Sequence, residues 1–150
     1  MLYLRQIFKP LFSLIIFGNL CSVFGQQTMQ IEAFLNEDNH TISIKQHIHY
    51  QNTSKEDLSE LYFNDWTSSF SSPTTPLANR FVEEFNGNLL AVKAKDRGYT
   101  KIRSIQNLRN DSLNYTYLEQ HPDLFKVTLD SVLKPDAITT LVFDYTLQIQ

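Results

Sequence analysis

Histidines are the residues whose spacing comes nearest to a metal site. His47 and His49 are two positions apart in a segment that alternates polar and apolar residues, so both side chains point to one face of a predicted strand. The register that we predict for this strand places Gln30 beside His47. Zinc usually takes at least three protein ligands. We therefore interpret the two histidines as part of an exposed polar strand face, and we predict no metal ligand here.

Paired carboxylates are the next candidates, because acid–base catalysis often uses two of them. Glu83 and Glu84 are adjacent in a predicted helix, and Asp57 and Glu60 flank a predicted turn. A catalytic carboxylate needs burial that shifts its pKa, and nothing in these two segments indicates burial. We interpret all four as solvated surface.

Aromatic side chains and short motifs complete the search for chemistry. Trp66 and Phe70 stand among Ser and Thr residues and could stack on a sugar, although large aromatics more often anchor cores and interfaces. The sequence contains no H-E-x-x-H, G-x-S-x-G, phosphate loop or Gly-rich dinucleotide turn. We therefore assign no catalytic, cofactor-binding or metal-binding residue. Four N-x-S/T triplets, which matter only in a glycosylating host, begin at Asn39, Asn52, Asn110 and Asn114.

Composition restricts the class of protein. The 150 residues are 42% hydrophobic and 13% aromatic, and their formal net charge is -3. Without a basic excess the chain is not expected to bind nucleic acid. Its apolar content, with only four Gly and five Pro, excludes a disordered or collagen-like chain. The length suits one domain of ordinary size.

The first 25 residues have the pattern of a secretory signal peptide. Arg5 and Lys9 precede an apolar run at 11–24, and Gly25 supplies a small residue for cleavage. This run is shorter than the ~20 residues of a membrane-spanning helix. A retained membrane anchor and a lipid-modified Cys21 are the alternatives. We predict an exported protein (periplasmic, cell-surface or secreted) that has no membrane span after cleavage.

Removal of residues 1–25 also changes the chemistry that remains. The segment carries two basic and no acidic residues, so residues 26–150 hold 11 basic and 16 acidic groups, a net charge of -5. The only cysteine is lost with it. Disulfides and cysteine-ligated zinc are therefore excluded from residues 26–150, and the domain must depend on its hydrophobic core.

Residues 26–150 alternate apolar and polar positions in short segments separated by polar turns. This pattern predicts an all-β fold, a two-sheet antiparallel β-sandwich, with one short helix near 77–85 where apolar residues have helical spacing. We expect a turn at 96–98, in which Gly98 is free to take positive φ. The last run, 138–149, still alternates at Gln150. We therefore expect the front part of a longer protein, with a complete small domain as the alternative.

A hairpin over residues 29–50 can be predicted with its register. Met29, Ile31, Ala33 and Leu35 alternate with polar residues, which is typical of a half-buried strand. If residues 37–40 form the loop, Glu32 lies opposite Lys45 and the apolar residues of both strands share one face. A slip by one residue would mix the two faces.

The same segments resemble a known protein family. Residues 40–54 (HTISIKQHIHYQNTS) and 58–63 (LSELYF) resemble the pattern T-I-x-G-x-x-x-I-x-Y-x-N-x-S followed by L-x-x-L-x-F at the start of the aminopeptidase N family of zinc metallopeptidases. Residues 123–129, 133–135 and 143–145 resemble its later strands and the turn between them. Gln46 and its neighbours lack the small residue of the family pattern, and the segment 64–99 is longer than usual, as in an exported bacterial branch.

The resemblance implies a scaffold rather than an active site. In that family the N-terminal β-sandwich packs on a catalytic domain whose zinc-binding helix lies beyond this length, so we transfer no catalytic or metal residue. The expected partners are that catalytic domain, within the same polypeptide, and the peptide substrates of the parent enzyme. Trp66, Phe70 and Phe85 are our candidates for the interface with it. The alternative is a free-standing exported β-sandwich that binds sugar, peptide or another protein.

Overall fold

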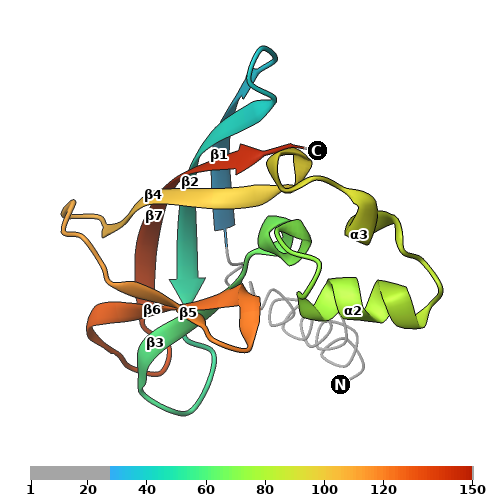
Figure 1. Cartoon of the computed structure of the whole chain (residues 1–150). Helices are drawn as coiled ribbons and strands as arrows, with labels where there is room; N and C mark the ends of the chain where they lie inside the picture. Colours follow the sequence, from blue (N-terminus) through green and yellow to red (C-terminus); the bar gives the residue numbers. More distant parts are fainter. Residues whose placement is uncertain (1–27, 150) are drawn as a thin grey trace, which may run out of the picture.

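Two antiparallel β-sheets pack against each other in the computed structural model, which describes residues 28–149 (Figure 1). Sheet A has the strand order β1-β2-β7-β4, and sheet B has the order β3-β6-β5. The predicted all-β sandwich is confirmed. The predicted signal segment 1–25, Cys21 included, lies outside the described residues.

The elements have the following bounds. Sheet A contains β1 (Thr28–Asn36), β2 (Thr41–Gln51), β4 (Tyr99–Asn107) and β7 (Ile138–Gln148). Sheet B contains β3 (Leu58–Asn64), β5 (Tyr115–Leu118) and β6 (His121–Leu133). Between β3 and β4 the chain forms a 3-10 helix η2 (Trp66–Phe70), helices α2 (Pro76–Glu83) and α3 (Asn88–Ala91), and a second 3-10 helix η3 (Ala94–Asp96). The described residues include no helix that could span a membrane by its length and apolar character.

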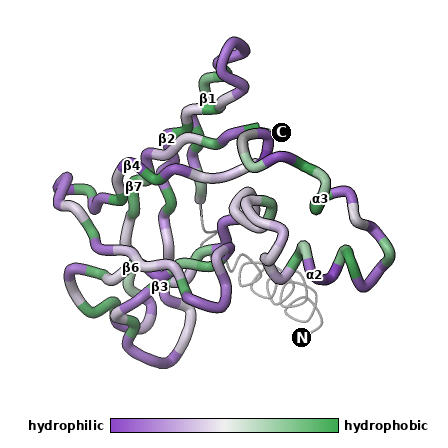
Figure 2. The backbone as a smooth tube through the Cα atoms, in the orientation of Figure 1, coloured by the Kyte–Doolittle hydropathy of each residue, from purple (hydrophilic) through white to green (hydrophobic). Residues whose placement is uncertain are grey.

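The predicted register of the β1–β2 hairpin is confirmed along its whole length. Asn36 pairs with Thr41, Glu32 with Lys45, and Met29 with Ile48. The loop between the strands is formed by residues 37–40, as expected, and it makes the hydrophilic tip of a hairpin that projects from the molecule (Figure 2).

The predicted helix near 77–85 is α2, and its start follows from its local sequence. The Thr75 side chain accepts a hydrogen bond from the Ala78 amide at 3.2 Å, which satisfies one of the free N–H groups of the first turn. Pro76 occupies the first helical position, where its missing N–H costs nothing. Helix α2 lies beside α3 on one side of the two sheets (Figure 1).

Some local expectations need correction. No described glycine has positive φ, so Gly98 does not use the conformational freedom expected of it. Four non-glycine residues adopt it instead: His40, Phe85, Asn110 and Asp136. The connection between β5 and β6 is also shorter than the polar segment 119–123 suggested, because β6 already begins at His121.

The hydrophobic core lies between β7 and β4 of sheet A and β3 and β6 of sheet B. Its most buried members are Ile105 and Leu141 from sheet A and Val127 from sheet B, each with 1% exposure or less. Leu61, Leu113, Phe125 and Phe143 complete the buried cluster. Strand β1 takes no part in this cluster.

Strand β1 is therefore not the half-buried strand that its pattern predicted. All nine of its residues are exposed, including Ile31 at 53% and Leu35 at 60%. The reason is that sheet B has three strands against four in sheet A, so the apolar face of β1 has no strand of sheet B across from it. A hollow between the two sheets lies on the same side of the molecule.

Candidate functional site

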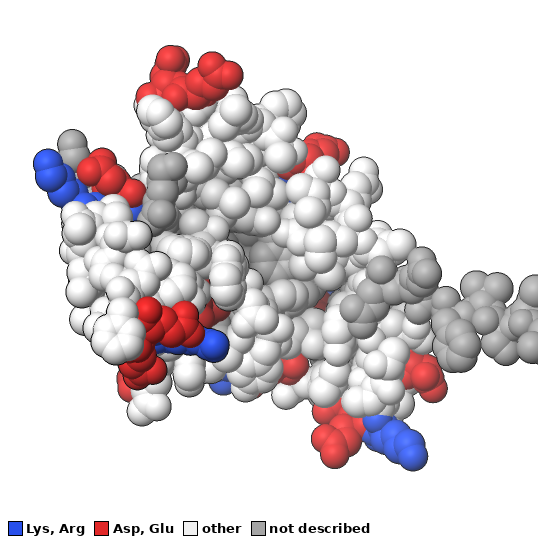
Figure 3. All heavy atoms as spheres, turned by 90° about the vertical axis from the view of Figure 1, so that its right-hand side faces the viewer, with Lys and Arg blue, Asp and Glu red and all other residues white. Residues whose placement is uncertain are grey.

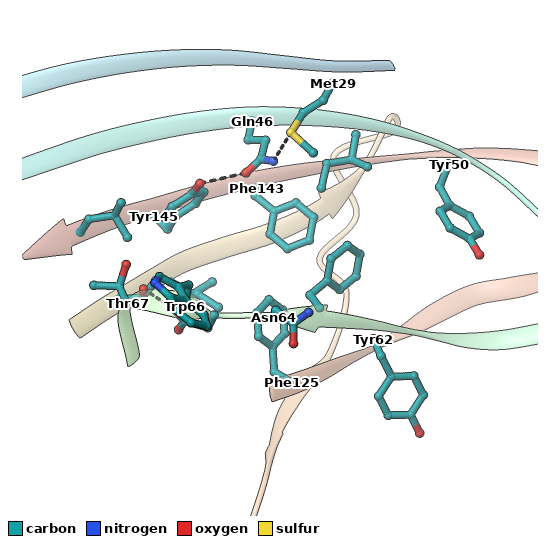
Figure 4. Close-up of a pocket in the computed structure, with 16 residues that line it drawn as sticks. Met29, Gln46, Tyr50, Tyr62, Asn64, Trp66, Thr67, Phe125, Phe143 and Tyr145 are labelled. Carbon is teal, nitrogen blue, oxygen red and sulfur yellow. Dashed lines mark hydrogen bonds between the residues drawn. The ribbon is translucent and has the colours of Figure 1, made fainter. Parts of the chain in front are cut away.

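A hollow of about 510 Å³ opens between the two sheets on the side where β1 and β3 form the sheet edges. Its size lies within the range of small-ligand pockets. We call it the inter-sheet cleft. Met29, Gln46 and Ile48 contribute from β1 and β2, and Tyr62 and Asn64 contribute from β3 (Figure 4).

The register of sheet A explains which side chains reach the cleft. Met29 pairs with Ile48, and Gln46 pairs with Phe143 on β7. Alternate residues of a strand point to the same face, so this row looks toward sheet B while His47 looks away from it. The hydrophobic alternation of β1, β2 and β7 thus gives the cleft its apolar wall.

Three phenylalanines form the floor of the cleft. The ring of Phe63 lies 5.6 Å from that of Phe125 in a stacked arrangement and 5.0 Å from that of Phe143, edge to face. Such pairs add about 1 kcal/mol each to the burial of the rings. The floor is therefore rigid and apolar.

A short chain of polar contacts crosses the apolar wall. The Tyr145 hydroxyl donates to Gln46 Oε1 at 2.8 Å, and Gln46 Nε2 donates to Met29 Sδ at 2.9 Å (Figure 4). Burial raises the pKa of the Tyr145 hydroxyl, and the charge of Asp65 contributes in the same direction. Tyr145 consequently stays a neutral hydrogen-bond donor, and Gln46 is satisfied without a ligand.

Asp65 is the one ionisable carboxylate that lines the cleft and is buried, at 6% exposure. Its Oδ1 accepts from the Ser68 amide and the Thr100 hydroxyl, and its Oδ2 accepts at 2.7 Å from both the Ser68 and Tyr117 hydroxyls. These four bonds use the four acceptor positions of a carboxylate. Asp65 therefore caps η2 and joins three segments, and it has no acceptor position left for a substrate proton or a metal ion.

The bond from Tyr117 to Asp65 also affects the tyrosine. Burial, and after it the hydrogen bond to Asp65, raises the pKa of Tyr117 well above its usual range. The raised pKa keeps the phenol protonated, so Tyr117 remains the donor in its hydrogen bond to Asp65. The Tyr117–Asp65 pair therefore stabilises the fold and is poorly suited to proton transfer.

Trp66 stands beside the cleft and extends it. A second hollow of about 280 Å³ is lined by Trp66 and Phe70 from η2 and by Leu147 from β7, and Trp66 and Leu147 also line the inter-sheet cleft. The Trp66 and Phe70 rings meet edge to face with their centres 6.1 Å apart, and Trp66 remains 68% exposed. The face on this side of the molecule is largely uncharged and hollowed near its middle, with most charged groups toward its margin (Figure 3).

The histidine pair lies away from the cleft. His47 pairs with Gln30, as predicted, and both lie on the outer face of sheet A. His49 Nδ1 is 2.8 Å from the Thr140 hydroxyl, so one ring nitrogen of that residue already has a partner. Within residues 28–149, no three His, Cys, Asp or Glu residues gather where they could hold a metal ion.

None of the carboxylates singled out in the sequence is buried. Glu84 forms an exposed helix-surface ion pair with Arg80 at 3.1 Å. Glu60 contacts Lys126 at 2.7 Å across β3 and β6, and the hydrogen bond from Lys126 lowers the pKa of Glu60. Asp57 and Glu83 are exposed.

The most constrained asparagine is Asn52, which begins one of the N-x-S/T triplets. It has 0% exposure, and its Nδ2 donates to the carbonyl oxygens of Glu56 at 2.8 Å and Leu133 at 2.9 Å. Its Oδ1 accepts from the amide and hydroxyl of Ser54. The side chain is therefore closed to glycosylation in the folded protein and instead ties the β2–β3 turn to the β6–β7 turn.

A second buried asparagine organises the loop after β4. Asn107 Nδ2 donates to Asp111 and to Asp130, at 3.0 and 2.8 Å, and its Oδ1 accepts from the Arg109 and Asp111 amides. The hydrogen bond from Asn107, with help from Arg109, lowers the pKa of Asp130. Asp111 and Asp130 thus serve as acceptors that hold the loop in place.

Sequence reasoning singled out Trp66 but missed Gln46, Asp65 and Asn107. The signal for Asp65 was its residue type, because Asp is among the residues preferred at the start of a helix, where its side chain accepts from a free amide. Gln46 could have been noticed as the polar residue that interrupts the row Ile42, Ile44, Ile48.

Comparison with known proteins finds no family model that matches the chain and no curated protein that matches its sequence.

Proposed function

We propose that residues 26–150 are the non-catalytic N-terminal scaffold domain of an exported aminopeptidase N-like zinc metallopeptidase, and that they pack on a catalytic domain of the same polypeptide. The observation that carries this proposal is the set of hydrogen bonds that Asn52 forms between the β2–β3 turn and the β6–β7 turn. Asn52 hydrogen-bonds the Y-x-N-x-S segment to the L-K-P segment through the Leu133 carbonyl. Two of the segments that carry the resemblance to that family are thus in direct contact. The asparagine is required there because it joins the two segments by hydrogen bonds.

The distribution of ionisable groups supports a scaffold role. The buried carboxylate, Asp65, has all its acceptor positions filled. Asp57, Glu83 and Glu84 are exposed, and Glu60 is half-buried and paired with Lys126. His47 and His49 offer two imidazoles on one strand, which is short of a zinc ligand set. The donor set of residues 28–149 therefore does not fit the zinc of that family, which in this proposal belongs to the catalytic domain together with the peptide substrates.

Exposed apolar side chains support a packing surface. Trp66 is 68% exposed and Phe85 is fully exposed, and the apolar row of β1 is also uncovered. Extended apolar surface on a globular domain marks an interaction site. In the proposed scaffold the neighbouring domain covers part of it, as is typical of contacts between domains of one chain.

The inter-sheet cleft favours a second candidate, a free-standing exported module that binds a sugar, a peptide or another protein. Its apolar wall, the exposed indole of Trp66 beside it and its few polar groups are features of a binding site.

The reading frame downstream of codon 150 distinguishes the two candidates. A continuing frame that encodes H-E-x-x-H supports the scaffold, and a stop codon directly after Gln150 contradicts it. Both candidates predict that the purified chain releases no product from alanyl or leucyl reporter peptides. Zinc-dependent turnover that survives repurification of the chain would overturn the assignment of no catalytic residues.

A further inference from the structure

Among residues 28–149, sheet B has no strand that faces β1, and the outer edge of β3 has no strand paired with it. Strand β3 pairs with β6 on one side only, while β1 has no strand of sheet B across from it. The inter-sheet cleft lies beside this position, with Met29 and Ile48 on the wall from sheet A and the ring of Phe63 on the side of β3. The Tyr62 side chain lies on the opposite face of β3, where its hydroxyl donates to Glu60 (Figure 4). A strand laid along β3 would therefore complete a four-on-four sandwich.

We propose that the edge of β3 accepts an extended segment of a partner polypeptide, which adds to sheet B as a fourth strand and fills the inter-sheet cleft with alternate side chains. Strand addition of this kind draws affinity from main-chain hydrogen bonds and specificity from the pockets that receive every second residue. The inference does not depend on the scaffold proposal.

The cleft defines the inward residues of the incoming strand. Its wall and floor are apolar, and its charged member, Asp65, already has four hydrogen bonds. A charged inward side chain would lose its hydration without gaining a partner. The inward residues are therefore uncharged and apolar.

The outer face of sheet B determines which residues suit the outward positions of the incoming strand. Glu56 and Asp57 are exposed just before β3, whereas Glu60 within β3 is already paired with Lys126 of β6 at 2.7 Å. Opposite charges on neighbouring strands attract, whereas like charges repel. A basic residue at an outward position of the partner segment complements this edge.

The β3 edge also carries no feature that would block such pairing. Natural sheet edges are protected by proline, by lysine or by a bulge in the exposed stretch. Residues 60–64 of β3 contain no proline or lysine, and they pair with β6 in continuous register; the single irregularity of β3 lies between Leu58 and Glu60. The last five residues of β3 are thus open to a partner strand.

A seven-residue peptide, acetyl-Thr-Val-Lys-Val-Thr-Val-Thr-amide, is a direct probe of this proposal. Trp66 is the only tryptophan of the chain and lines the cleft, so its fluorescence reports occupation. We expect saturable binding, and we expect hydrogen exchange of β3 amides to slow by about tenfold at saturation. A peptide with proline in place of the central valine, which lacks one main-chain donor, should bind at least about tenfold more weakly.

Two variants of the chain provide a matched control on β1. Met29→Glu places a charge at the cleft wall, whereas Leu35→Glu places the same charge on the same face of β1 outside the cleft. Both positions are about as exposed, at 58% and 60%, so both variants should fold. We expect M29E to weaken peptide binding by at least about tenfold and L35E to leave it within about twofold.

Several results would overturn the proposal. They are absence of saturable binding, equal binding of the proline peptide, and slowed exchange elsewhere than in β3. Concentration-dependent self-association of the chain that protects the β3 amides without peptide would show that a second copy occupies the edge instead.

Discussion

Asn52 forms as many side-chain hydrogen bonds as an asparagine can, with two donated and two accepted, and all four join main-chain or side-chain groups of two turns. A buried polar group without a partner costs about 1–3 kcal/mol. Removal of this one side chain would leave the Leu133 and Glu56 carbonyls without that donor at a site closed to water. Asn52 therefore fixes the position of the two turns relative to each other.

We expect Asn52→Ala to lower the free energy of unfolding by about 3 kcal/mol, because it leaves buried groups unpaired and creates a small cavity. Urea denaturation of the chain followed by far-UV circular dichroism measures it. Asn114→Ala, at an exposed position that also begins an N-x-S/T triplet, is the control and should change stability by less than about 0.5 kcal/mol. Equal effects of the two variants would contradict the role given to Asn52.

The Tyr117–Asp65 bond predicts how stability depends on alkaline pH. The pKa of Tyr117 is raised in the folded state, chiefly by burial, from an ordinary value of 10.0. Below that ordinary value both states keep the phenol protonated, so the stabilisation is fully present. As the pH rises above it, the unfolded state loses its proton first and the folded state becomes less stable.

We expect Tyr117→Phe to be less stable than the wild type at pH 7, by about 1 kcal/mol for the lost hydrogen bond, but to lose stability less steeply above pH about 10. Urea denaturation at a series of pH values gives both slopes. Tyr99→Phe, at a residue that is 46% exposed, is the matched control and should keep the wild-type slope. Parallel slopes for wild type and Tyr117→Phe would show that the phenol ionises alike in both states.

At the scale of elements, the end of α2 combines a regular cap with an unusual residue. The Asn86 amide donates to the Phe81 carbonyl at 2.7 Å and the Phe85 amide to the Val82 carbonyl at 3.0 Å, which together make a Schellman cap. The residue that takes the left-handed conformation there is usually glycine, yet here it is Phe85, with φ of 60° and full exposure. The helix end thus carries a strained aromatic side chain that contacts nothing in the described part of the chain.

We expect Phe85→Gly to raise the free energy of unfolding by about 1 kcal/mol, because glycine adopts positive φ without the steric cost of a Cβ. Val82→Gly, within the helix, should lower it by about 1 kcal/mol. Thermal denaturation of the two variants tests the opposite signs. A loss of stability in Phe85→Gly would mean that the aromatic ring contributes contacts that outweigh its backbone strain.

The elements also show what could be predicted from the sequence. The β1–β2 register followed from alternation and from the Glu32–Lys45 pair, which are local properties of neighbouring strands. The exposure of β1 could not be predicted from its alternation. Burial of its apolar face would require a strand of sheet B across from it, and the described fold has no strand at that position. Asp65 was missed for a similar reason, since two of its partners, Thr100 and Tyr117, lie far along the chain.

At the scale of the whole molecule, the core occupies only part of the inner face of sheet A. Leu141 on β7 has 0% exposure and Leu35 on β1 has 60%, although both belong to that face. Burial, and with it the free energy of packing, is therefore concentrated on the side of β7 and β4, whereas the side of β1 is exposed.

We expect Leu141→Ala to lower the free energy of unfolding by about 3 kcal/mol, through lost burial and the cavity that remains. Leu35→Ala should lower it by less than about 0.5 kcal/mol, because that side chain is already in water. Urea denaturation of both variants measures the difference. A large loss in Leu35→Ala would show that the face of β1 is covered in solution.

Strand β7 lies in the middle of sheet A, between β2 and β4, although it is the strand that the ribosome delivers last among those described. The β1–β2 hairpin can form as soon as it is synthesised, but it must wait for a neighbour about a hundred residues further along, since His49 pairs with Thr140. Such distant pairing is slow to form. A nascent chain stopped before residue 138 would lack the strand that joins β2 to β4, so one edge of each would stay unpaired until β7 is made.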